Sequence, residues 1–83
     1  MGWTHVTVIL RYTVNLLPEP EGGFTVRVPA LPPVVTYGIN ENEALIMARE
    51  AIEAILAVYR EEGSEIPDDV VPLVRTVVVN APS

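Results

Sequence analysis

The side chains that could carry out chemistry are few, and none stands beside the partners that catalysis requires. The chain has no cysteine, which excludes thiol catalysis, cysteine-ligated zinc and iron–sulfur clusters. His5 is the only histidine, and no serine is placed for it to activate. Its position next to the N-terminus is typical of a surface or strand-edge residue. We therefore predict no catalytic residue, no metal site, no cofactor site and no enzymatic activity.

The acidic residues do not form a nuclease pattern either. A two-metal nuclease needs carboxylates that project from the centre of its sheet, and the segments that read as strands contain no Asp or Glu. Asp68 and Asp69 are neighbours in a proline-containing loop, where they could bind a cation but are more typical of solvated side chains. Gly22 and Gly23 lack the lysine of a phosphate-binding loop and predict a turn.

Four segments read as strands: the first two alternate apolar and polar residues, the third is short, and all are rich in β-branched residues. The first two segments are joined by a Pro- and Gly-rich turn, so they are expected to form an antiparallel hairpin. The last is apolar on both faces apart from Arg75 and Thr76, as expected of a strand that is covered on two sides. The sequence leaves open whether this last strand pairs within its own chain or across a dimer. The predicted strands span about residues 4–17, 23–29, 34–38 and 73–79.

One long helix is predicted at about residues 41–62, a stretch without Gly or Pro. Asn40 is a good N-cap, Glu43 completes a capping box three residues later, and Gly63 is a natural C-terminal stop. The element order β-β-β-α-β predicts a single α+β domain over residues 1–83, with an antiparallel sheet and one helix packed on one face.

The apolar arc of this helix is wider than one small sheet can cover. Beside the main apolar face runs a second stripe, which predicts a subunit interface in a homodimer or higher homo-oligomer. The alternative is that these residues serve helix propensity alone. The stripe contains Met47, Ala54 and Val58.

The charge balance favours a basic partner. Eleven acidic residues oppose five Arg, giving a net charge of −6, which disfavours direct DNA binding and raises the encounter rate with basic proteins; simple solubility is the alternative. Glu43, Glu50 and Glu61 on the helix are the candidate steering residues.

Arg11 and Arg27 are expected on the exposed face of the sheet, where they would bind an acidic partner, phosphate or RNA, or simply face solvent.

Neither a membrane span nor a signal peptide is expected. The apolar runs are far shorter than the roughly 20 residues that a spanning helix requires. The N-terminus lacks the basic and apolar regions of a signal peptide. We expect a cytoplasmic protein.

The order and spacing of several short motifs resemble the HicB-like family of toxin–antitoxin antitoxins. These motifs are a Pro/Glu-rich turn that leads into an aromatic-led strand, a Pro-x-Leu-Pro loop, a short strand that ends in glycine, and a capped helix rich in Glu and Ala. One departure is that Pro33 follows Pro32 where the family usually has glycine. The matching segments are Pro18–Val26, Pro29–Pro32, Thr36–Gly38 and Glu43–Ile52.

The resemblance implies a partial RNase H-like fold that acts by protein binding. Full antitoxins of this family resemble two-part proteins, in which the core domain covers HicA, a small basic mRNA-cleaving toxin, and a C-terminal segment binds operator DNA. Since the sequence stops at Ser83, directly after the last predicted strand, the resemblance implies toxin binding without DNA binding. The alternative is an orphan homo-oligomeric module that has no toxin partner.

Overall fold

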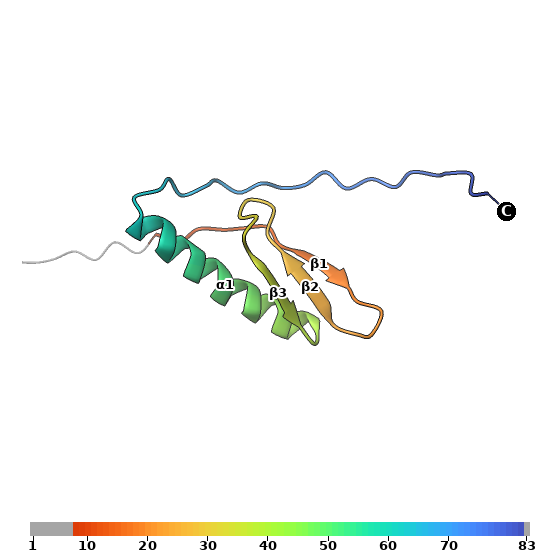
Figure 1. Ribbon diagram of the computed structural model, residues 1–83, viewed down its shortest axis with the longest axis horizontal. Coiled ribbons are helices and arrows are strands. Elements are labelled where there is room, and N and C mark those ends of the chain that lie inside the picture. Colours follow the sequence, from red (N-terminus) through yellow and green to blue (C-terminus); the bar gives the residue numbers. More distant parts are fainter. Residues whose placement is uncertain (1–7, 83) are drawn as a thin grey trace, which may run out of the picture.

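Three short strands and one long helix make up the body of the protein (Figure 1). The computed structural model describes residues 8–82, so His5 and the predicted beginning of the first strand lie outside the described residues. The strands form one antiparallel sheet in the order β1-β2-β3, and α1 lies across one face of it. The predicted α+β fold is confirmed. The elements are β1 (Asn15–Pro18), β2 (Phe24–Arg27), β3 (Val35–Gly38) and α1 (Glu41–Glu61).

The turn between β1 and β2 forms where the glycine pair predicts it. Gly22 and Gly23 have φ angles of 105° and 77°, which L-residues with a side chain rarely adopt. The Gly22 amide donates to the Glu19 carbonyl, and the Glu19 amide donates to the Gly23 carbonyl. The resulting register places Leu16 opposite Val26, so that both face the helix. Val26 is completely buried, as its alternation with polar neighbours predicts.

Both ends of α1 are capped by the residues that the sequence indicates. Asn40 accepts a hydrogen bond at Oδ1 from the Glu43 amide at 2.8 Å. The Glu43 carboxylate in turn accepts from the Ile39 amide at 3.2 Å, one residue earlier than in the standard capping box. At the other end Gly63 has a φ of 69°, and its amide donates to the Arg60 carbonyl. The predicted and observed helices therefore agree to one residue.

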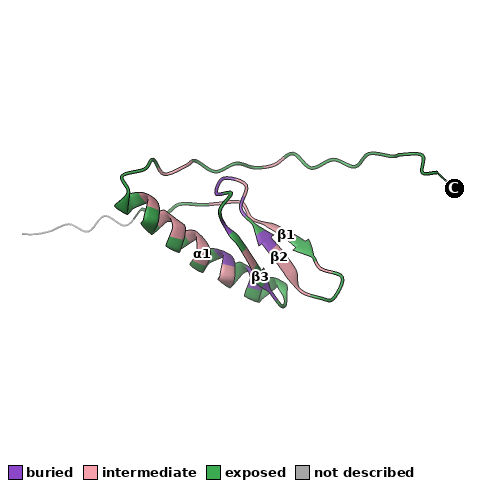
Figure 2. Ribbon diagram, viewed as in Figure 1, coloured by how far each residue is buried: buried purple, intermediate pink, exposed green. Residues whose placement is uncertain are grey.

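The core lies between α1 and the sheet in two adjoining clusters (Figure 2). In one, Val26 of β2 packs against Ala44 and Ala48 of α1. In the other, Leu31 lies completely buried in the loop before β3 and packs with the second half of the helix. The two central residues of the Pro-x-Leu-Pro segment, Ala30 and Leu31, thus belong to the core.

The structure differs from the sequence prediction in the first and last strands. Within the described residues, β1 is paired only from residue 15, and residues 8–14 are extended without a ladder. Residues 73–79 form no strand in the single chain but continue as an exposed, extended segment. The physical reason is the same in both places. A strand needs a neighbouring strand to satisfy its backbone hydrogen-bonding groups, and the single chain provides no such neighbour for either segment.

Candidate protein-binding face

The solvent side of α1 carries a line of carboxylates. Glu43, Glu50 and Glu61 are all exposed and separated by seven and eleven residues. Both separations are close to whole numbers of turns at roughly 3.6 residues per turn, so the three side chains project in nearly the same direction. The structure thus brings the three predicted steering residues into one row, which we call the acidic row.

An apolar stripe runs directly beside the acidic row. Met47, Ala54 and Val58 follow helical spacing, and Val58 has 44% of its surface exposed. Ala54 is exposed and Met47 is half-buried. In the single chain, Ala54 and Val58 therefore remain uncovered beside the main core.

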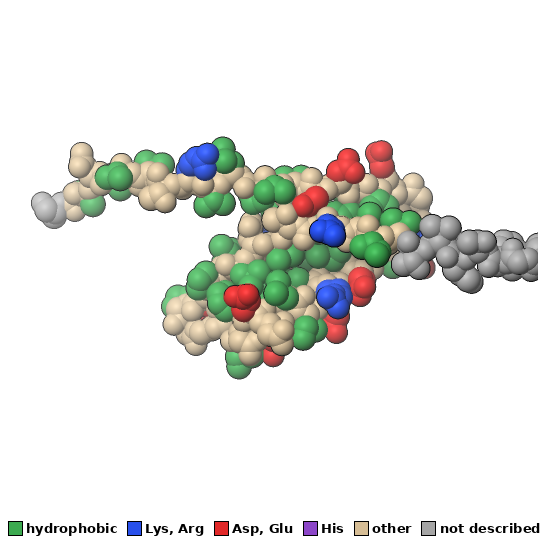
Figure 3. Space-filling view, turned by 180° about the vertical axis from the view of Figure 1, so that it is seen from behind, with side chains coloured by type: hydrophobic (Ala, Val, Ile, Leu, Met, Phe, Trp, Pro, Cys, Tyr) green, Lys and Arg blue, Asp and Glu red, His purple; other side chains and the backbone are tan. Residues whose placement is uncertain are grey.

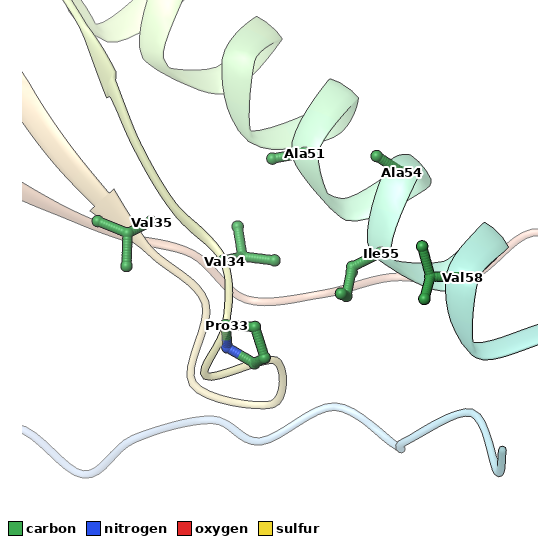
Figure 4. Close-up of a pocket in the computed structure, with 7 residues that line it drawn as sticks. All are labelled: Pro33, Val34, Val35, Ala51, Ala54, Ile55 and Val58. Carbon is green, nitrogen blue, oxygen red and sulfur yellow. The ribbon is translucent and has the colours of Figure 1, made fainter. Parts of the chain in front are cut away.

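Next to this stripe, the helix and the loop before β3 enclose a shallow apolar groove of about 290 Å³ (Figure 4). The loop contributes Pro33 and Val34, and β3 contributes Val35, which is 52% exposed. Sequence reasoning identified the helix side of this groove but not the loop side, because only the burial of Leu31 brings the loop beneath the helix. We call this recess the apolar groove; it is lined by Pro33, Val34, Val35, Ala51, Ala54, Ile55 and Val58.

Glu43 has a second role that limits its use in steering. Its carboxylate accepts the Ile39 amide hydrogen bond that holds the start of α1. A change at this position therefore alters helix capping as well as surface charge. Glu50 and Glu61 make no side-chain hydrogen bond within residues 8–82, so they test surface charge alone.

The two basic candidates are exposed but do not share the sheet. Arg27 lies in β2 opposite Asn15, on the face turned away from the helix. Arg11 lies in the extended run before β1 and outside the paired strands. The structure therefore supplies one sheet-face arginine rather than a basic cluster.

The loop after the helix is attached to the N-terminal run by a clamp that the sequence did not predict. The Asp69 carboxylate accepts hydrogen bonds from the Thr13 amide at 2.8 Å and from the Thr13 hydroxyl at 2.7 Å. The Tyr12 hydroxyl donates to the Pro67 carbonyl. Burial raises the pKa of Tyr12, and Asp68 and Asp69 add to this effect, which keeps the donor protonated. Asp69 thus has a structural partner, unlike a free solvated carboxylate.

The Asp69 clamp gives a pH-dependent prediction. The two hydrogen bonds from Thr13 lower the pKa of Asp69 below its ordinary value of 3.8. A carboxyl group whose pKa is lowered in the folded state stabilises the fold at pH values above 3.8. This stabilisation is lost as the pH falls through the lowered pKa of Asp69. In an NMR titration we expect the Thr13 amide signal to shift with a midpoint below pH 3.8, and Asp69→Ala to abolish that shift. A midpoint at or above 3.8 would contradict the clamp.

The described part of the chain contains neither a cluster of metal-ligating side chains nor a helix that could cross a membrane. Over residues 8–82, no three His, Asp or Glu side chains lie close enough together to hold a metal ion. In the same range, α1 is the only helix, and its charged residues make it too polar to cross a membrane.

Three known proteins are similar in sequence to this chain. It is 38% identical to antitoxin HicB 1 of Photorhabdus laumondii over 68 residues, which is 80% of this chain and 44% of that protein. It is 38% identical to the UPF0150 protein Ta0767 of Thermoplasma acidophilum over 72% of this chain and 87% of that protein. It is 36% identical to antitoxin HicB of Escherichia coli K12 over 70% of this chain and 42% of that protein. No family model matches the chain.

Proposed function

This chain belongs to the HicB-like family, and from that premise we propose that it neutralises a small, basic, HicA-like mRNA-cleaving toxin by covering it. The observation that carries the proposal is the similarity to two HicB antitoxins over 70–80% of the chain. The chain spans less than half the length of these two antitoxins, and nearly all of the Thermoplasma protein. The proposed activity is accordingly that of a toxin-binding core domain.

We propose that the domain acts by binding rather than by catalysis, through the solvent side of α1. A basic toxin would be attracted first by the acidic row, since complementary charge mainly accelerates association. The apolar groove beside it would then hold the complex, because desolvated apolar contacts at the centre of an interface supply most of its affinity. Neutralising an mRNA-cleaving toxin would place the protein in the cytoplasm.

The test uses a HicA-like protein encoded beside this chain. We expect the two to co-purify and the toxin's growth arrest to be relieved by co-expression. The double variant Glu50→Lys/Glu61→Lys should slow association roughly tenfold or more at low salt, since steering of this kind changes association rates by about 10- to 1,000-fold. Stopped-flow association kinetics measure this rate directly.

A matched control separates local steering from net charge. Glu21→Lys/Glu65→Lys makes the same change in net charge at exposed sites outside α1, and we expect it to slow association much less. The difference should shrink at 1 M salt, where the screening length is only about 3 Å. If the wild-type chain neither binds nor neutralises the toxin, the proposed function is wrong; if both double variants slow association equally, the acidic row is not the steering site.

A further inference from the structure

Two segments with strand-like sequences have no partner in the single chain. One is the run at residues 8–14, where Val8 and Ile9 are 66% and 82% exposed. The other is residues 70–82, which we call the C-terminal arm. Every residue of the arm from position 73 onward is exposed, and Val78 reaches 93%. Exposed apolar strands of this kind are uncommon in a stable monomer because they offer unpaired edges to other chains.

The arm leads away from its own body. It leaves the Asp69 clamp and runs outward to the C-terminal end without returning to the sheet (Figure 1). The chain therefore measures 74 × 25 × 19 Å and has a radius of gyration of 17.1 Å. A compact chain of this length would have a radius of gyration of about 12 Å. The radius of gyration is larger than that of a compact chain because the apolar arm extends beyond the body and is not packed against it.

Prolines at the base of the arm hinder its return. Pro67 and Pro72 have fixed φ angles and no amide hydrogen, and Pro72 also confines Val71 to extended backbone. To cover its own residues 8–14 the arm would have to reverse direction within this short, stiff stretch, since it starts beside Thr13 and runs away from the red beginning of that segment (Figure 1). A short hinge of restricted conformation favours exchange of the segment between copies.

The body offers a recess that matches the arm. Residues 8–14 and α1 enclose a hollow of about 850 Å³, lined on one side by Val8, Leu10 and Tyr12 and on the other by helix side chains that include Ile52 and Leu56. Seen from behind, hydrophobic side chains occur both along the arm and over the adjoining body (Figure 3). An added strand would pair with the free edge of residues 8–14 and cover this hollow with one of its faces.

Charge also favours the arm as the occupant. The arm carries a single charged residue, Arg75, whereas the rest of the chain has all eleven acidic residues and only four Arg. Two bodies without their arms would repel each other, since each combines eleven acidic residues with four Arg and so has a net charge of −7. A nearly neutral strand can approach without that repulsion, and the hollow that it would cover is lined by charges of both signs, Arg49, Glu53 and Arg60.

From these observations we propose that two copies of this chain form a dimer by exchanging arms. The arm of each copy adds as a β-strand beside residues 8–14 and the outer edge of β1 of the other copy, and covers the hollow between that run and α1. The contact is reciprocal, as in an isologous dimer. It leaves the acidic row uncovered and does not depend on the proposed toxin-binding function.

Two measurements on the full chain, without any toxin, test this proposal. Sedimentation equilibrium should give twice the monomer mass of 9.1 kDa at micromolar concentration. In a mixture of isotope-labelled and unlabelled copies, intermolecular NOEs should connect the methyl groups of the arm with those of Val8, Leu10 and Leu56. The variant Val78→Asp should weaken dimerisation by roughly 30-fold or more, the scale of a buried interface residue. Circular dichroism should still show a folded helix, because Val78 is exposed in the single chain.

Ile46→Asp is the matched control. Ile46 is a half-exposed apolar residue of α1 that lines neither the hollow nor the apolar groove. The same added charge there should leave the dimer intact. A 9.1-kDa species in which the arm shows NOEs only to its own body would overturn the proposal in favour of an arm that folds back. A dimer that Val78→Asp does not weaken would overturn it in favour of another interface.

Discussion

Gly38→Ala is expected to cost about 3 kcal/mol or more in the free energy of unfolding, at or beyond the upper end of ordinary overpacking. A Cβ at this position would lie 2.2 Å from the backbone nitrogen of Ala44 and 2.3 Å from its Cα. Both are backbone atoms in the first turn of α1, so no side-chain rotation relieves the clash. The helix would have to move off the end of β3. Urea unfolding, followed by circular dichroism, measures the loss.

Gly63→Ala is the control for this prediction. Gly63 has a φ of 69°, yet an added Cβ there meets no atom within 4 Å. Its substitution should therefore cost only the backbone strain of a left-handed alanine, about 1–2 kcal/mol. If the two variants lose the same stability, close packing between β3 and α1 is not the reason for glycine at position 38.

The contact at Gly38 gives a physical reason for two of the short motifs that the sequence shares with the HicB-like family. The third strand ends in glycine, and the helix that follows carries alanine in its first turn. Ala44 is completely buried, and Gly38 lies directly against its backbone. Two small residues at this place let the helix cross the sheet at very short range and bring Val26 into contact with it.

The helix and the hairpin turn were predictable because their signals are local. Asn40 and Gly63 mark the ends of α1 through hydrogen bonds to residues a few positions away, so the sequence alone places both ends within a residue. Gly22 and Gly23 define the turn through their own φ angles. Such features depend on neighbours in the chain and hardly at all on tertiary context.

The last strand could not be predicted to pair, because pairing depends on a partner that propensity does not specify. Residues 73–79 have a strand composition, but nothing in their sequence says which edge they meet. The same holds for residues 8–14. The proposed arm exchange would give both segments the strand structure that their patterns predict, in the dimer rather than in the single chain.

The candidate face was predictable only on its helix side. The spacing of Glu50, Glu61 and Val58 follows from helical periodicity, which a sequence reveals directly. The opposite wall of the apolar groove, formed by Pro33 and Val34, depends on how the preceding loop packs. That packing is a long-range contact between the loop and the second half of α1, and no periodic pattern signals it.

The side chain at the centre of that packing is Leu31, and its truncation gives the second large prediction. Leu31 has no exposed surface and packs with a cluster that includes Ile55 and Tyr59 of α1. Leu31→Ala should lower the free energy of unfolding by about 2–5 kcal/mol, the range for truncating a fully buried leucine. In a chain of this size the loss is a large part of the total free energy of unfolding, which is about 0.05–0.15 kcal/mol per residue.

The matched control is Leu17→Ala in β1, because Leu17 is 47% exposed on the face turned away from the helix. The same chemical truncation there should cost less than about 1 kcal/mol. Since the Leu31 carbonyl accepts a hydrogen bond from the Val34 amide, loosening Leu31 also releases one wall of the apolar groove. Under conditions where Leu31→Ala is still folded, the proposed toxin binding should therefore weaken, whereas Leu17→Ala should bind as the wild type does. Equal losses of stability in the two variants would show that this loop is not part of the core.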